Sequence, residues 1–158
     1  LTIRQNVEFG LRIKHMPEDY IKEQTEYFLD MVGLTKFQEY YPRQLSASML
    51  QRASIARAFA VRPEVLLMDE PYGQLDVELR FKLEDELIRL WREVGTTVIF
   101  ITHNIEEAVY LSERILVLTN KPTKIKAEIP NSLPRPRDIA APEFVALRNQ
   151  VTDLIKWW

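Results

Sequence analysis

The first part of the chain carries apolar side chains at the spacing of three and four positions that is typical of helices. Pro17 can open a helix that Gly33 ends, because proline suits a first turn and glycine suits the residue after a last turn. A polar, aromatic connector follows. Ser46 can then cap a second helix with small apolar residues along one side. We therefore predict a helical subdomain over residues 1–62.

The pattern changes at residue 63, where short apolar runs replace the helical spacing. The run 65–68 is unbroken, which suits a strand buried on both faces of a parallel sheet, and a second buried strand is expected over 97–102. A third strand is expected over 114–119, and helical patterns lie between the strands. This alternation predicts an α/β fold with right-handed crossovers over residues 63–120.

The last part of the chain, 121–158, is richer in proline. We expect it to begin as a hairpin or an extended linker and to end in an amphipathic helix. Trp157 and Trp158 could anchor that helix at a membrane interface. Packing against the core is the favoured interpretation, because the apolar spacing continues to Trp158.

Composition narrows the classes of function. The 158 residues include 21 Lys and Arg against 23 Asp and Glu, a near-neutral balance that argues against a nucleic-acid binder with a strongly basic surface. The absence of cysteine excludes disulfides, a thiol nucleophile and cysteine-bound zinc from this sequence. The four glycines form neither a GxxxxGK[ST] phosphate loop nor a GxGxxG dinucleotide motif.

Polar side chains follow two of the expected strands. Asp69 and Glu70 follow the first, and His103 follows the second. Ligands of open α/β sheets collect at the carboxyl ends of strands, so these groups are expected to converge on one triphosphate. One carboxylate can hold hydrated Mg²⁺, and the other can orient or deprotonate water. The alternatives are a strand-end turn for the acidic pair and a hydrogen-bonded core residue for the histidine.

Four segments together resemble the motifs of ABC-transporter ATPases, in that family's order and near its spacing. They are YPRQLSASMLQR (41–52) with the following ASIARAFAVRP (53–63), LLMDEP (66–71), GQLD (73–76), and THN with EA (102–108). They look like the signature segment and its helix, the Walker B motif with the catalytic glutamate, the D-loop and the switch-histidine loop. LPRPR (133–137) and the helix after it look most like importers of the nitrate, sulfonate and taurine group.

The resemblance implies the fold and the chemistry of the Mg²⁺ site. The fold would be α/β: the second half of a P-loop NTPase (RecA-like) core with parallel strands, preceded by an ABC-type α-helical subdomain. Asp69 would hold the water shell of Mg²⁺, Glu70 would polarise the attacking water, and His103 would sense the γ-phosphate of ATP. Mg²⁺ and ATP are thus the expected cofactors.

The resemblance also implies contacts across a head-to-tail dimer of ATP-binding subunits. Asp76 would bridge to the opposite subunit, a role compatible with capping its own helix. Ser46, with Ala47, Ser48 and Gln51 of the same segment, would meet the γ-phosphate held by that subunit. The start of a helix directs N–H groups and a positive dipole end at an anion, which suits this role.

The sequence departs from the family at two places. The signature usually reads LSGG, and the side chains of Ala47 and Ser48 obstruct the close approach that glycine allows, although the Ser48 hydroxyl could donate instead. The family's P-loop, stacking aromatic and glutamine loop have no match within these 158 residues. We therefore expect a fragment of a longer product that is inactive alone. Its apolar strand edges beside the missing P-loop strand would be left unpaired.

The favoured hypothesis is an ATP-hydrolysing subunit that energises an ABC importer of a small solute. It would lie peripherally at the cytoplasmic face of the inner or plasma membrane. Its partners would be a second such subunit, a transmembrane permease facing the helical subdomain near 36–41 and, indirectly, a solute-binding protein, with no nucleic acid. The alternative is a non-catalytic interaction module derived from such an ATPase. A soluble ABC-type ATPase of repair or translation is disfavoured, because heptads and basic arms are absent.

Overall fold

The computed structural model describes residues 1–73 and 77–155, which form two compact units. The N-terminal unit spans Leu1–Ile99 and the C-terminal unit spans Phe100–Trp158. Within the described residues, no helix combines the length and the apolar character that crossing a membrane requires.

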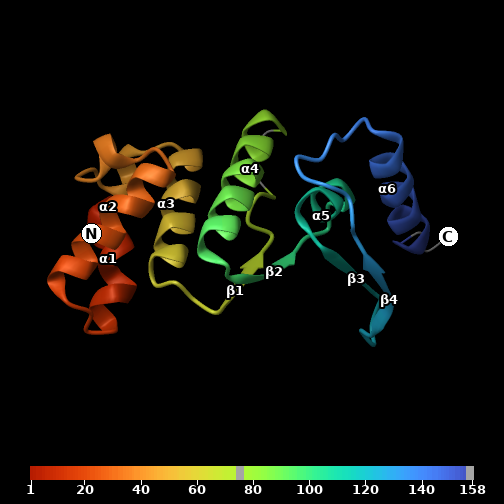
Figure 1. Ribbon diagram of the computed structural model, residues 1–158, viewed down its shortest axis with the longest axis horizontal. Coiled ribbons are helices and arrows are strands. Elements are labelled where there is room, and N and C mark those ends of the chain that lie inside the picture. Colours follow the sequence, from red (N-terminus) through yellow and green to blue (C-terminus); the bar gives the residue numbers. More distant parts are fainter. Residues whose placement is uncertain (74–76, 156–158) are drawn as a thin grey trace. The chain divides into compact units, whose positions relative to one another are not determined.

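Helices dominate the first two thirds of the N-terminal unit (Figure 1). The helices are α1 (Ile3–Ile13), α2 (Glu18–Met31) and α3 (Ala47–Ala60), and two short 3-10 turns, η1 (Thr35–Phe37) and η2 (Pro42–Gln44), join α2 to α3. Helix α2 begins after Pro17, and the chain turns at Gly33 with a φ of 66°, as predicted. Helix α1 packs against both α2 and α3. Their shared core is apolar and consists of Ile3, Val7, Leu11, Phe28, Leu29, Ala56 and Phe59.

Close packing of α1 against the end of α3 depends on a glycine. A Cβ atom placed on Gly10 would lie 2.5 Å from Cγ1 of Val61, the residue that follows α3. Real Cβ atoms do not approach another carbon atom this closely, so a side chain at position 10 would displace Val61.

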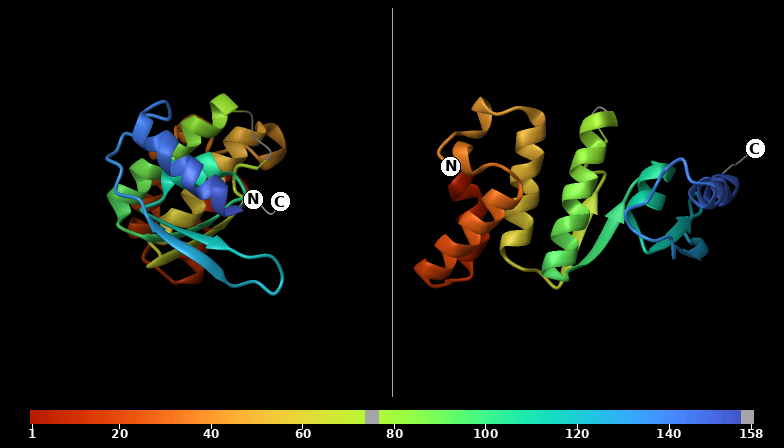
Figure 2. Two further views of the ribbon diagram at one scale, coloured as in Figure 1. Left: turned by 90° about the vertical axis from the view of Figure 1, so that its right-hand side faces the viewer. Right: turned by 45° about the horizontal axis from the view of Figure 1, so that its top comes forward.

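A strand–helix–strand segment follows, and only its last two residues, Phe100 and Ile101, belong to the C-terminal unit. It consists of β1 (Val65–Asp69), α4 (Val77–Val94) and β2 (Thr97–Ile101), and Gly95 ends α4 with a φ of 72°. The amide of Thr97 donates to the carbonyl of Glu64 at 3.0 Å. Because Glu64 immediately precedes β1 and Thr97 begins β2, the two strands run parallel in a two-stranded sheet. Helix α4 lies beside α3 (Figures 1 and 2).

The predicted burial of the first two strands on both faces is wrong. Side chains of β1 are exposed, by 53% at Val65 and 70% at Leu67, and Ile99 of β2 is 50% exposed. Only two strands form this sheet, so α4 can cover one face while alternate apolar side chains stay in contact with solvent. The apolar runs of β1 and β2 therefore include side chains that the described residues leave exposed.

The C-terminal unit contains α5 (Ile105–Leu111), β3 (Arg114–Leu118), β4 (Ile125–Pro130) and α6 (Pro142–Ile155). Strands β3 and β4 form an antiparallel hairpin, from Arg114 opposite Pro130 to Leu118 opposite Ile125, with an irregularity after Val117 (Figure 2). Of the two alternatives expected after residue 120, a hairpin or an extended linker, the structure has the hairpin, although its first strand is β3, which the sequence pattern had assigned to the parallel sheet. Helix α6 packs on α5 and β3, burying Phe144 and Val151.

The third expected strand does not extend the parallel sheet. Strand β3 forms a sheet with β4 that is separate from the sheet of β1 and β2. The hairpin offers β3 a local antiparallel partner a few residues along the chain, whereas pairing with β2 would close a longer loop. The fold is therefore mixed α/β, with parallel strands in one sheet and antiparallel strands in the other.

Candidate functional site

Asp69 and Glu70 lie where β1 ends, and both side chains are exposed. Glu70 has a φ of 44°, the left-handed region that residues other than glycine rarely adopt. The amide of Gly73 donates to the carbonyl of Glu70 at 3.3 Å, which closes a tight turn. The Glu70 carboxylate lies over this turn, because its Oε2 atom is 3.7 Å from the place of a Cβ on Gly73. Such strain is typical of functional positions.

The start of α3 carries the predicted signature residues. Ser46 is the N-cap, and its Oγ atom accepts a hydrogen bond from the amide of Met49 at 3.3 Å, as predicted. The Ser46 Oγ atom also lies 3.1 Å from Oγ of Ser48. Ser46 and Ala47 are exposed, and Ser48 is half-buried. The first amides of a helix have no partner within it, so this accessible end can receive an anion.

Gln51 lies half-buried on α3, one turn after the cap. Its neighbour Arg52 is directed away from the cap, because its Nη1 atom donates to the carbonyl of Val32 at 2.9 Å. This bond joins the first half of α3 to the residue that follows α2.

His103 is exposed in the C-terminal unit, on the short link between β2 and α5. Local hydrogen bonds order this link: the Asn104 amide donates to Oγ1 of Thr102 at 2.9 Å. The Asn104 side chain accepts from the amides of Glu106 at 3.0 Å and Glu107 at 3.3 Å, as a helix cap. His103 and Glu70 belong to different units, which are each described by themselves. Their predicted convergence on one ligand therefore stays a prediction. Asp76 lies outside the described residues.

The carboxylate of Asp69 fits a Mg²⁺ ion in its chemistry. Mg²⁺ keeps several water ligands and is bound by one or two carboxylates together with substrate phosphates, so an accessible aspartate at a strand end is a suitable donor. Within residues 1–73 and 77–155, no group of three or more histidine, aspartate or glutamate side chains could hold a metal ion unaided.

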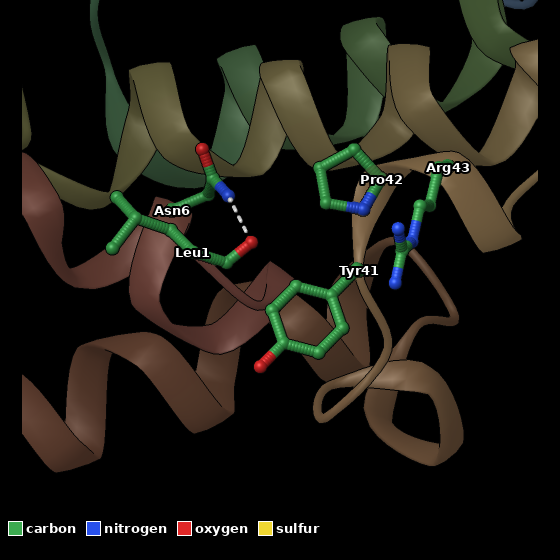
Figure 3. Close-up of a pocket in the computed structure, with 5 residues that line it drawn as sticks. All are labelled: Leu1, Asn6, Tyr41, Pro42 and Arg43. Carbon is green, nitrogen blue, oxygen red and sulfur yellow. Dashed lines mark hydrogen bonds between the residues drawn. The ribbon is translucent and has the colours of Figure 1, made fainter.

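Sequence reasoning missed an open depression of about 620 Å³ that the first residues of the signature-like segment 41–52 help to line (Figure 3). It lies between the start of α1 and the turn η2, and Asn6 Nδ2 donates to the Leu1 carbonyl at 3.4 Å beside it. Its lining is Leu1, Asn6, Tyr41, Pro42 and Arg43. None of the residues given a catalytic, nucleotide-binding or metal-binding role in the sequence analysis lines it, and its sequence signals were the aromatic connector and the start of the signature-like segment.

A second missed feature is polar and belongs to the C-terminal unit. Asn131 and Arg137 are buried, and both donate hydrogen bonds to backbone carbonyls at the end of α5. The LPRPR segment marked this region in the sequence, but the direction of its arginine side chains could not be inferred from it.

Comparison with known proteins gives the N-terminal part of the chain a family match. Residues 1–73 match the family model described as ABC transporter. The matched residues include the signature segment and the carboxylates at the end of β1.

Curated relatives match nearly the whole chain. An uncharacterized ABC transporter ATP-binding protein of Methanocaldococcus jannaschii is 44% identical over 98% of this chain and 58% of the relative. A nitrate import ATP-binding protein of Synechocystis is 38% identical over 99% and 62%. An aliphatic sulfonates import ATP-binding protein of Bacillus cereus is 40% identical over 96% and 59%. The chain thus spans about three fifths of the length of the curated relatives it matches.

Proposed function

We propose that this chain is part of an ATP-binding and ATP-hydrolysing subunit of an ABC importer. The observation that carries the proposal is the exposed acidic pair at the end of β1, where Glu70 is held in a left-handed conformation. The match of residues 1–73 to the ABC transporter family supports it. The names of two relatives favour a small solute of the nitrate or sulfonate type.

In this proposal, the carboxylates divide the work at the nucleotide. Asp69 holds the water shell of Mg²⁺, which would supply charge neutralisation at the phosphates. Glu70 accepts a hydrogen bond from the attacking water and orients it. His103 hydrogen-bonds a γ-phosphate oxygen. Phosphoryl transfer depends mainly on such positioning and on stabilised charge.

The start of α3 serves the nucleotide of a second subunit. Its accessible amides and the hydroxyl of Ser46 can donate to a γ-phosphate in a head-to-tail dimer, where Gln51 of the same helix and Asp76 complete the contact. The helical part of the chain faces a transmembrane permease, and Tyr40 and Tyr41 offer exposed aromatic surface for it. The subunit would lie at the cytoplasmic face of the membrane.

The test is ATP hydrolysis by the protein produced from its whole reading frame. Glu70→Gln is expected to slow turnover by at least about a hundredfold, the usual contribution of a positioned acid–base group. Glu64→Gln is the matched control, because Glu64 is an exposed glutamate just before the same strand. Equal turnover in the parent protein and Glu70→Gln would remove Glu70 from the mechanism.

The histidine is tested in the same assay. The chain has two histidines, His15 and His103, and both are exposed. His103→Asn should reduce turnover with little effect on ATP binding, whereas His15→Asn should change neither. Loss of turnover in both variants would point to a general effect on the protein rather than to a γ-phosphate contact.

One observation favours a second function, a non-catalytic interaction module. Side chains stand at Ala47 and Ser48, where the related signature has glycines, and they narrow the approach of a phosphate to α3. Reading the coding DNA upstream of Leu1 separates the two. An in-frame GxxxxGK[ST] segment supports the ATPase, and a start codon at this boundary supports the module.

A further inference from the structure

A buried arginine binds the end of α5. Arg137 is 8% exposed, and its Nη1 atom donates to the carbonyls of Val109 at 2.9 Å, Tyr110 at 2.7 Å and Ser112 at 2.7 Å. The Nε atom donates to the carbonyl of Leu133 at 3.3 Å. The last carbonyls of a helix have no partner within it, and a cation is favourable at this negative end of the helix dipole.

Two further side chains from the same segment bind the same turn. Asn131 Nδ2 donates to the carbonyls of Val109 at 2.8 Å and Ser112 at 3.0 Å, and Arg135 donates to the carbonyl of Leu111. The segment 131–137 therefore supplies donors to every carbonyl that the end of α5 presents between residues 109 and 112. We call Asn131, Arg135 and Arg137 the α5 clamp.

Burial makes the charged form of the Arg137 guanidinium less stable than it would be in water. Burial, together with the nearby charge of Arg135, lowers the pKa of Arg137 to about 10, while the carboxylate of Glu113 acts in the opposite direction. Arg137 stays protonated at neutral pH, so it offers a cation to neutral carbonyls. A buried charge retained for backbone carbonyls alone indicates that the geometry of this turn matters.

The clamp acts on a helix that is too short to be stable alone. Helix α5 has seven residues, and isolated helices below about 12 residues are marginal in water. Asn104 fixes its first turn, and the α5 clamp fixes its last turn. His103 immediately precedes the Asn104 cap, so the position of α5 sets the position of the histidine backbone.

We propose that Arg137 is a positioning residue for His103, acting through α5. The inference rests on the proposed function, in which the His103 imidazole contacts the γ-phosphate. It assigns to the segment 131–137 the task of holding the histidine link in one place. A purely structural arginine would instead stabilise the whole C-terminal unit without a specific effect on His103.

The first experiment follows the two histidine rings by NMR in the full protein. Arg137→Lys keeps the charge but loses the planar fork that reaches several carbonyls at once. The ring signals of His103 should shift or broaden, whereas those of His15 should stay in place. The control is Arg114→Lys, an exposed arginine of β3 paired with Glu128 at 3.2 Å. Unchanged His103 signals in Arg137→Lys would overturn the proposal.

Amide hydrogen exchange separates positioning from general destabilisation. Residues 105–111 should exchange about tenfold faster in Arg137→Lys, while β3 and β4 keep their protection. Equal acceleration throughout the C-terminal unit would mean a structural role alone. Arg135→Gln, which removes a single clamp bond at a half-buried residue, gives a milder variant if Arg137→Lys does not fold, and it should show the same pattern with a smaller change.

ATP turnover completes the test. Arg137→Lys should lower kcat about tenfold and leave KM for ATP unchanged, because positioning of His103 matters in the transition state and not for ATP capture. A displaced His103 with unchanged kcat would reject the catalytic consequence. No turnover in the parent protein would reject the proposed function instead, and the NMR and exchange results would still decide whether Arg137 positions His103.

Discussion

The hydroxyl oxygen of Ser46 lies 3.1 Å from the hydroxyl oxygen of Ser48, across the first turn of α3. Ser46 also accepts a hydrogen bond from the amide of Met49. The cap residue therefore contacts Ser48, which stands where the related signature has glycine. The Ser48 side chain therefore occupies the approach to the helix amides, and its hydroxyl is already held toward Ser46.

Replacing Ser48 by glycine should open this approach. We expect Ser48→Gly to raise ATP turnover about fivefold, equivalent to about 1 kcal/mol of transition-state stabilisation, because the phosphate can come closer to the amides. The measurement is kcat at saturating ATP. Ser54→Gly, at an exposed serine on the same helix, controls for the loss of helix propensity. A slower Ser48→Gly enzyme would mean that the Ser48 hydroxyl itself donates to the phosphate.

The conformation of Glu70 predicts a conflict between stability and activity. At a φ of 44°, glycine is free of the strain that any side chain suffers. Glu70→Gly should therefore be more stable than Glu70→Ala by about 1 kcal/mol, although both lose the carboxylate and hydrolyse no ATP. Urea unfolding of the two variants gives the comparison. Higher stability for Glu70→Ala would contradict the left-handed conformation.

Local features of this fold could be predicted from the sequence, because neighbouring residues determine them. The Ser46 cap, the turn at Gly33 and the hairpin after β3 all depend on contacts within a few positions. These short-range signals identified the start of α3 correctly. They also located the acidic pair at the end of a strand.

Features that depend on distant partners could not be predicted in this way. The apolar run containing Leu67 suggests burial, but the sheet ends after two strands and leaves that side chain exposed. The sequence of β3 also does not show that its partner in the folded chain is β4. Arg137 appears in the sequence as one residue of LPRPR, and only the folded chain brings its guanidinium to the carbonyls of α5.

Glu86 on α4 should make the stability of the N-terminal unit depend on pH. Burial raises the pKa of Glu86 above 4.5, and the charges of Arg52 and Arg89 offset this only in part. Its Oε2 atom is buried and has no hydrogen-bond partner among the described residues. Because the folded pKa is raised, the ionised carboxylate destabilises the fold at neutral pH, and this penalty disappears as the pH falls below about 4.5.

Glu86→Gln should therefore raise the free energy of unfolding at pH 7. The gain should stay below about 1 kcal/mol, because solvent reaches much of the side chain, and it should shrink toward pH 4. Urea unfolding between pH 4 and pH 8 measures the profile. Glu78→Gln, at an exposed residue of the same helix, should show no such gain. A loss of stability at pH 7 would mean that attraction to Arg52 and Arg89 outweighs burial.

The close approach of Gly10 to Val61 predicts that Gly10→Ala destabilises the protein when Val61 is present and stabilises it when Val61 is replaced by alanine. Alanine in place of glycine stabilises a helix interior by about 1 kcal/mol when space is available. At Gly10 the added methyl group would meet Cγ1 of Val61 at 2.5 Å, and a valine side chain rotates poorly. Gly10→Ala should therefore destabilise the parent protein by about 1–3 kcal/mol.

Removing the opposing methyl groups should reverse that effect. In a Val61→Ala background, Gly10→Ala meets no Cγ1 atom, so helix propensity dominates and the substitution should stabilise the protein. Urea unfolding of the four proteins gives the coupling energy between the two positions. If Gly10→Ala stabilises the protein with Val61 intact, then α1 does not pack against the end of α3 as closely as the structure indicates.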